Sequence, residues 1–230
     1  MSLIDSGSAG RYLLYAIGEI LLVMIGILLA LQVNNWNEWR KDRVKEYKVL
    51  EQLSKTLDAN SDHIAIALNR ISDAKQATDS VLSIIEKNRP YQESFNELFH
   101  PTRVVWGVNL TTSGYEELKN AGFDIVQSDS LKEVLINLFD SEYPNTEKIV
   151  DIPLYSGRFE DYMYDNFKHL RERNEMRPLN YNRLINDHYY FEQLVQISGL
   201  RTWKLLVLRE TLEENQRVLQ LIKDKLGERE

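Results

Sequence analysis

Four histidines have the side chains best suited to acid–base or metal chemistry at neutral pH. None lies in an HExxH motif or another spacing typical of a metal site, and the chain has no cysteine to complete one. The nearest group of candidates is His188 with Asp161 and Asp165, which lie on an earlier predicted helix. We expect aromatic core packing with polar tips in this region. An enzyme with an unrecognised site near these three residues is the alternative.

Other catalytic patterns are missing from the sequence. It contains no glycine-rich phosphate loop, GxSxG motif or paired-carboxylate signature, so we expect no catalytic, metal-binding or cofactor-binding residue, no cofactor and no enzymatic activity. The net charge is −7 and there is no long basic stretch, which disfavours a nucleic-acid partner. Without cysteine, the redox compartment stays open.

An aromatic stripe accompanies these candidates. Phe159, Tyr162, Tyr164 and Phe167 recur at roughly helical spacing. Such a stripe is more often packed core than the lining of a ligand pocket, although a pocket between helices is the functional alternative.

The longest apolar element of the sequence is the segment at residues 12–33, where Glu19 is the one acidic or basic side chain. At 1.5 Å per residue it would be about 33 Å long, which matches a hydrocarbon core of about 30 Å. A signal peptide has a shorter apolar core, and Ala30-Leu31-Gln32 is a poor cleavage site. A buried helix of a soluble protein rarely runs this long with one charge. The segment therefore predicts a transmembrane helix with the lipid bilayer as its partner.

Aromatic residues bracket this segment. Tyr12 and Tyr15 lie at one end, and Trp36 and Trp39 lie just beyond the other. Because amphipathic rings favour the headgroup region, we predict that these four residues are interfacial anchors.

Small residues and one acid give the segment a candidate contact face. Gly18 and Gly26 are eight residues apart, and Gly26 with Ala30 forms a small-xxx-small pair that lets helix backbones approach closely. Glu19 would be costly if it faced lipid at depth. We therefore predict a contact with a second copy or another membrane protein through Gly18, Glu19, Gly26 and Ala30. The alternative for Glu19 is an acid tolerated near a helix end.

The remaining chain predicts long helices. After a tail at residues 1–11 and the span at 12–33, residues 34–90 form a helical stalk with apolar residues three and four apart, although a break near residues 58–62 is an alternative. A similar stripe at residues 199–230 predicts a last helix that packs back along the stalk, and a parallel oligomeric coil is the competing arrangement.

The middle region, residues 91–198, combines shorter predicted elements. We expect helices at residues 93–99, 114–120, 131–143, 149–173 and 184–198, with loop or strand at 104–108. Hydroxyl caps at residues 111–113 and 128–130 mark two helix starts, and Gly122, Pro144 and Gly199 mark helix ends. The fold class is therefore mainly α: one N-terminal transmembrane helix followed by a long-helix bundle with a helical-hairpin middle region.

The run RYLLYAIGEILLVMIGILLALQVNNWNEWRK closely resembles the N-terminal signature of a bacterial family of uncharacterised single-pass membrane proteins. The later TTSGYEELKNAGFDIVQSDSLKEVL is similar, more loosely, to that family's helical hairpin. The resemblance implies a bacterial inner membrane and a periplasmic C-terminal part, and it supplies no catalytic residue.

The charges around the span indicate the opposite side. Arg11 is the basic residue before it, whereas Arg40, Lys41, Arg43 and Lys45 follow it, which favours a cytoplasmic C-terminal part. Taken together, the sequence predicts a membrane-anchored helical module for interaction, scaffolding or sensing, with an accessory subunit of a membrane complex as the second alternative.

Overall fold

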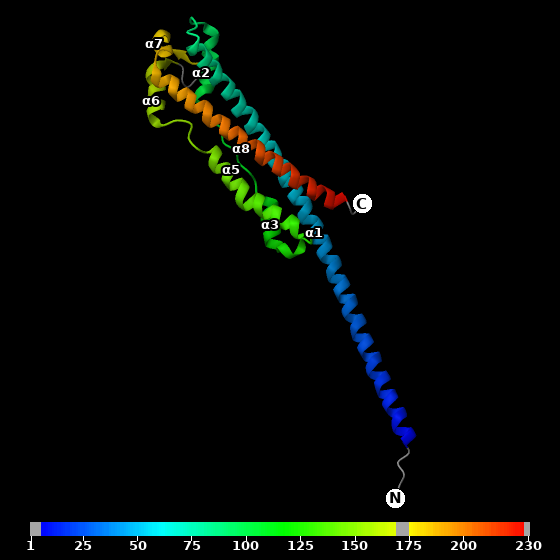
Figure 1. Cartoon of the computed structure of the whole chain (residues 1–230). Coiled ribbons are helices and arrows are strands. Elements are labelled where there is room, and N and C mark those ends of the chain that lie inside the picture. Colours follow the sequence, from blue (N-terminus) through cyan, green and yellow to red (C-terminus); the bar gives the residue numbers. More distant parts are fainter. Residues whose placement is uncertain (1–5, 169–174, 228–230) are drawn as a thin grey trace. The chain divides into compact units, whose positions relative to one another are not determined.

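The computed structural model describes the backbone of residues 6–168 and 175–227, and within these ranges the side chains from Tyr15 onward. Helices make up most of this part of the chain, and its one sheet has two short strands (Figure 1). The predicted mainly α fold is thus confirmed. Contacts divide the chain into two compact units, Met1–Val49 and Leu50–Glu230, which we call the N-terminal unit and the helical unit.

The first helix, α1 (Ser6–Glu86), contributes residues to both units. It is continuous through residues 58–62, so the break considered there does not occur. No proline precedes Pro90, and no glycine lies between Gly26 and Gly107 to interrupt it. Past its end, Asn88 adopts a left-handed φ of 44°, and the N–H of Arg89 donates to the Ile84 carbonyl at 3.1 Å. The N–H of Asn88 also donates to the Ile85 carbonyl at 3.0 Å, so the helix ends in a Schellman motif.

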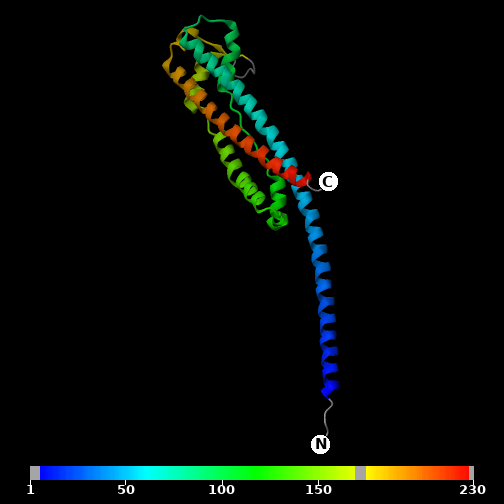
Figure 2. The same ribbon diagram turned by 45° about the vertical axis from the view of Figure 1, so that its right-hand side comes forward.

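The last helix, α8 (His188–Gly227), lies alongside the second half of α1 within the helical unit (Figures 1 and 2). Their direction is antiparallel, because Ser198 bonds to Asp79 and Asn215 bonds to the Leu57 carbonyl. The predicted helix end at Gly199 is wrong, since α8 continues through this residue. Gly199 is exposed, so its only cost is the low helix propensity of glycine. The buried residues on both sides of it stabilise the helix by packing.

Shorter elements fill the middle of the chain. In order they are η1 (Glu93–Phe95), α2 (Asn96–Arg103), α3 (Ser113–Ala121), η2 (Phe123–Ile125), α4 (Asp129–Asn137), η3 (Leu138–Glu142), α5 (Tyr143–Val150), α6 (Gly157–Asn166), β1 (Phe167–Lys168), β2 (Arg177–Pro178) and α7 (Tyr181–Ile185). The strands β1 and β2 pair antiparallel, with Phe167 opposite Pro178.

Some predicted boundaries hold and others do not. Ser128 caps α4 by accepting the Leu131 N–H at 3.3 Å, and Gly122, with φ of 90°, follows the end of α3. The expected stop at Pro144 is wrong: the helical run continues past it in α5, and α5 directly follows a π-helical turn. This turn, η3, joins α4 to α5.

Two further expectations are corrected in this region. The predicted helix at residues 149–173 is interrupted: α5 ends at Val150, α6 begins at Gly157, and β1 follows α6 directly. Residues 169–173 of this prediction lie outside the described residues. Thr112 at the start of α3 makes no side-chain cap, so the predicted hydroxyl cap is absent at that residue.

The core of the helical unit lies along the two apolar stripes. On α1 the buried stripe includes Leu50, Leu53, Leu57, Ile64, Ala67, Ile71, Ala74 and Val81, and on α8 it includes Leu194, Ile197, Leu205, Leu208, Leu219 and Ile222. Asn60 and Thr78, which fill the two gaps in the α1 stripe, are fully buried. Both are hydrogen-bonded, as burial of polar groups requires.

Candidate functional site

The apolar part of α1 exposes its side chains. An 18-residue window in the helix from Tyr15 onward has a mean hydropathy of 2.4, and none of it is buried within the chain. One helix of the described chain is therefore long and apolar enough to cross a membrane. Tyr15, Trp36 and Trp39 are all exposed, whereas the side chain of Tyr12 lies outside the described residues.

The candidate contact face of this segment is open. Glu19 and Ala30 are exposed, and a Cβ added at Gly18 or Gly26 would meet no atom of the chain within 4 Å. These four residues therefore leave space for the close approach of another helix.

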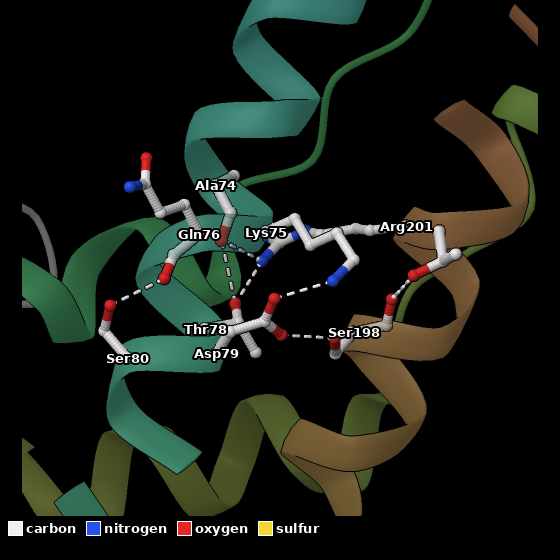
Figure 3. A network of polar contacts seen from close by, with 9 residues as sticks. Ala74, Lys75, Gln76, Thr78, Asp79, Ser80, Ser198 and Arg201 are labelled. Atoms are coloured by element: carbon white, nitrogen blue, oxygen red, sulfur yellow. Dashed lines mark hydrogen bonds and ion pairs between the residues drawn. The ribbon is translucent and has the colours of Figure 1, made fainter. Parts of the chain in front are cut away.

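Arg201 is the centre of a buried polar network in the helical unit. It reaches from α8 to α1, where its Nη1 donates to the Ala74 carbonyl at 2.8 Å and to Thr78 at 2.5 Å (Figure 3). Its Nη2 donates to the carbonyls of Pro101, Thr102 and Val104, at the end of α2. Burial lowers the pKa of Arg201 to about 10, so the guanidinium stays charged at neutral pH.

Lys204, one turn later on α8, binds the end of another helix in the same way. Its Nζ donates to the carbonyls of Val150 and Ile152 at 2.6 and 2.5 Å, where α5 ends. Burial lowers the pKa of Lys204. Because the last carbonyls of a helix lack intrahelical donors and carry partial negative charge, each of these two cations satisfies one helix C-terminus.

Asp79 lies beside Arg201 and is already engaged. Lys75 donates to one carboxylate oxygen at 2.6 Å and Ser198 to the other at 2.5 Å (Figure 3). Partial burial acts to raise the pKa of Asp79, but these hydrogen bonds outweigh it and hold the pKa below its ordinary value. Asp79 is thus an ionised structural acceptor and a poor proton acceptor for catalysis.

A polar hollow of about 620 Å³ adjoins this network. Its lining includes Lys75, Gln76, Asp79 and Arg89 together with three serines of α1. It offers hydroxyl, amide and cationic donors, so it can hold water or a small polar molecule.

The structure does not assemble the histidine site considered from the sequence. Asp161 and Asp165 are exposed on α6, and the His188 side chain is 86% exposed, with Glu192 at 3.8 Å. Asp187 has a structural role instead: it accepts the Tyr162 hydroxyl at 2.8 Å and the N–H of Tyr189 at 2.9 Å, at the start of α8.

Three of the four side chains of the aromatic stripe pack in or against the core. Phe159 and Phe167 are buried, Tyr162 is half-buried, and Tyr164 is half exposed to solvent. The Phe159 ring stacks on that of Tyr190, with centroids 6.3 Å apart. The stripe therefore fills the space that a ligand pocket would need. Among the described residues, no three histidine, aspartate or glutamate side chains form a group that could hold a metal ion.

Sequence reasoning missed Arg201 and Lys204. Their signal was present, because two cations at helical spacing interrupt an otherwise apolar stripe of α8. Such a position predicts either a break in the helix or a buried, paired cation.

Comparison with known proteins found no family model, no curated protein and no solved structure that matches this chain.

Proposed function

We propose that this protein is a single-pass membrane protein whose helical unit serves for interaction or sensing at the membrane surface. The observation that carries the proposal is the exposed apolar segment of α1, with its mean hydropathy of 2.4 and no residue of the window buried in the chain. A soluble protein rarely leaves so large a contiguous apolar surface in water.

The energetics favour insertion. Ten leucine, isoleucine and valine residues lie in residues 20–33. On an insertion scale they contribute about 3–6 kcal/mol in favour of the membrane. Glu19 opposes this with about 3 kcal/mol at the bilayer centre and less near a helix end. The apolar residues therefore outweigh the one acid.

Two features support an interaction role. The glycines and Glu19 of the segment leave an open face for a second copy or another membrane protein. In the helical unit, Arg201 and Lys204 fasten the ends of α2 and α5 to α8, which keeps the surfaces between these elements in a fixed arrangement. A rigid surface lowers the entropic cost of binding a partner.

The test is extraction of cell membranes with alkaline carbonate. We expect the full chain to stay in the membrane pellet and a variant lacking residues 12–33 to become soluble. Recovery of the full chain in the carbonate supernatant would contradict the proposal.

The membrane and the side need a separate measurement. The family resemblance supports a bacterial inner membrane with the helical unit in the periplasm, whereas the basic residues after the span support the cytoplasm. A reporter that is active only outside the cytoplasm, fused after Glu230, assigns the side: activity supports the periplasm and inactivity the cytoplasm.

A further inference from the structure

Residues 104–111 form an extended strip within the helical unit that belongs to no sheet. Exposure alternates along it: residues 105, 107 and 109 are exposed, whereas 106, 108 and 110 are partly or fully buried. Period-two alternation is the pattern of a β-strand that covers a core on one face.

The strip runs along α1, and its far end is fastened there. The N–H of Thr111 donates to Asn60 Oδ1 at 2.8 Å, and its carbonyl accepts from Asn60 Nδ2 at 2.9 Å. His63 Nδ1 lies 2.9 Å from the Asn109 carbonyl. On the opposite edge, the N–H of Leu110 donates to Glu147 of α5 at 2.8 Å.

These bonds fix which backbone groups face α1. In an extended chain the N–H and C=O of one residue point the same way, and the direction alternates between neighbours. Thr111 and Asn109 bond to α1 and Leu110 bonds to α5. The same alternation, continued along the strip, would turn the backbone groups of Gly107 and Val105 toward α1. Within the described ranges, the N–H and C=O groups of residues 105–108 have no hydrogen-bond partner in the chain.

Two hollows open between α1 and the strip at this edge. One, of about 270 Å³, is lined by residues that include His63, Ile66 and Val108. The other, of about 290 Å³, is lined by residues that include His100 and Pro101. Trp106 and Arg70 line both hollows and so mark the boundary between them.

Arg70 brings a guanidinium to this groove, and Asp73, one turn later on α1, lines the second hollow beside it. The Arg70 guanidinium lies over the Trp106 ring, 4.3 Å from the centroid, and no described residue forms an ion pair with it. Stacking occupies the face of a guanidinium and leaves its in-plane N–H donors available for a carboxylate.

We propose that the groove between α1 and residues 104–109 binds an extended peptide of a partner protein, which pairs with the free backbone edge at Gly107 and places a carboxylate on Arg70. Side chains at alternate positions of the peptide enter the two hollows. Strand addition of this kind takes its affinity from main-chain hydrogen bonds and its specificity from pockets for alternate side chains.

The charge argues for a partner peptide over a second copy. Residues 104–109 read VVWGVN and hold no carboxylate, so the same strip of a second copy does not satisfy Arg70. The inference deepens the interaction role proposed above by naming the partner's chemistry. A binding assay on the groove is independent of membrane insertion, so the two proposals fail separately.

The test uses the full chain in phosphatidylcholine nanodiscs and a library of acetylated, amidated hexapeptides with valine at two alternate positions and all residues varied elsewhere. Empty nanodiscs correct for binding to lipid. We expect the selected peptides to carry Asp or Glu at one fixed position and to slow hydrogen exchange at the amides of residues 105 and 107.

Matched variants give the decisive comparison. Arg70→Gln, and Glu→Gln in the selected peptide, should each weaken binding about tenfold or more. Arg158→Gln is the control, because Arg158 also lies over an aromatic ring, that of Tyr189 at 4.9 Å, on another surface. N-methylation of the peptide at the residue opposite Gly107 should weaken binding similarly.

The proposal is overturned if no hexapeptide binds more tightly than about 1 mM, if Arg70→Gln leaves binding unchanged, or if the selected peptides show no preference for Asp or Glu. Preferential binding of helical peptides or of a second copy of the chain would also overturn it.

Discussion

Arg201 and Lys204 lie three residues apart on α8, and each donates to carbonyls at the end of a different helix. Among the described residues, no carboxylate forms an ion pair with either cation; backbone carbonyls and a threonine hydroxyl accept their hydrogen bonds. A cation placed in this way joins elements that are distant in the sequence, and it does so only when every acceptor is in place. At the scale of single residues, these two side chains therefore determine where α2 and α5 sit on α8.

We expect Arg201→Met to lower the free energy of unfolding by about 3–5 kcal/mol, because it removes five hydrogen bonds and takes from the Thr102 and Val104 carbonyls the donor that they have among the described residues. Arg209→Met, at an exposed position of the same helix, is the matched control and should change stability by less than about 0.5 kcal/mol. Urea unfolding of both variants in detergent measures the difference. Equal midpoints would show that the Arg201 network contributes nothing to stability.

Gly114 marks a close approach of α3 to α1. A Cβ at this position would lie 2.9 Å from the Gln52 carbonyl oxygen and 2.9 Å from Leu53 Cα, both backbone atoms that cannot rotate away. We expect Gly114→Ala to destabilise the helical unit by about 1–3 kcal/mol. Gly157→Ala, where the added Cβ meets nothing within 4 Å, is the control. A thermal midpoint unchanged by Gly114→Ala would contradict the close packing.

At the scale of elements, periodicity was a good guide and single glycines and prolines were poor ones. The apolar stripes predicted buried faces on α1 and α8, because burial of a regular stripe is the main source of helix stability in proteins. Gly199 does not end α8, because the buried residues on both sides of it outweigh a local cost of about 1 kcal/mol for glycine. Pro144 does not end the helical run either, since the π-helical turn directly before α5 changes the local backbone pairing.

The continuity of α8 can be tested at Gly199. We expect Gly199→Ala to stabilise the chain by about 0.5–1 kcal/mol, since the site is helical, exposed and has open space for a Cβ. Gly199→Pro should destabilise it by about 3 kcal/mol or more, because proline breaks a helix interior. If alanine destabilised and proline were tolerated, two separate helices would describe this region better. Denaturant midpoints of the two variants decide the question.

At the scale of the whole molecule, the sequence could predict an apolar helix and a mainly α fold, since both depend on composition and period. It could not predict the groove at Trp106 or the network at Arg201, because both join residues from three segments that meet only in the folded chain. The histidine site that was the alternative to core packing is not assembled, because Asp161 and Asp165 are exposed on α6 and the His188 side chain is 86% exposed.

Buried tyrosines give the fold a dependence on alkaline pH. Burial raises the pKa values of Tyr115, Tyr143, Tyr162 and Tyr190, so the folded state holds these protons more tightly than the unfolded state. Their contribution to stability is complete below the ordinary tyrosine pKa of about 10 and is lost as the pH rises above it.

We therefore expect the urea midpoint of the full chain to be constant from about pH 8 to 9.5 and to fall at about pH 11. Tyr190→Phe removes one titrating group, so its midpoint should fall less steeply over the same interval. A midpoint that does not change up to pH 11, or an equal slope in the variant, would contradict this account.

The central claim is that residues 12–33 cross a lipid bilayer. Because the chain has no cysteine, single cysteines placed in turn at residues 15–39 can each carry one spin label in phosphatidylcholine vesicles. We predict that accessibility to oxygen is highest and accessibility to a nickel chelate lowest near Ile25, and that both return to aqueous values beyond Trp39. A nickel accessibility that is high and uniform across residues 15–39 would contradict the claim.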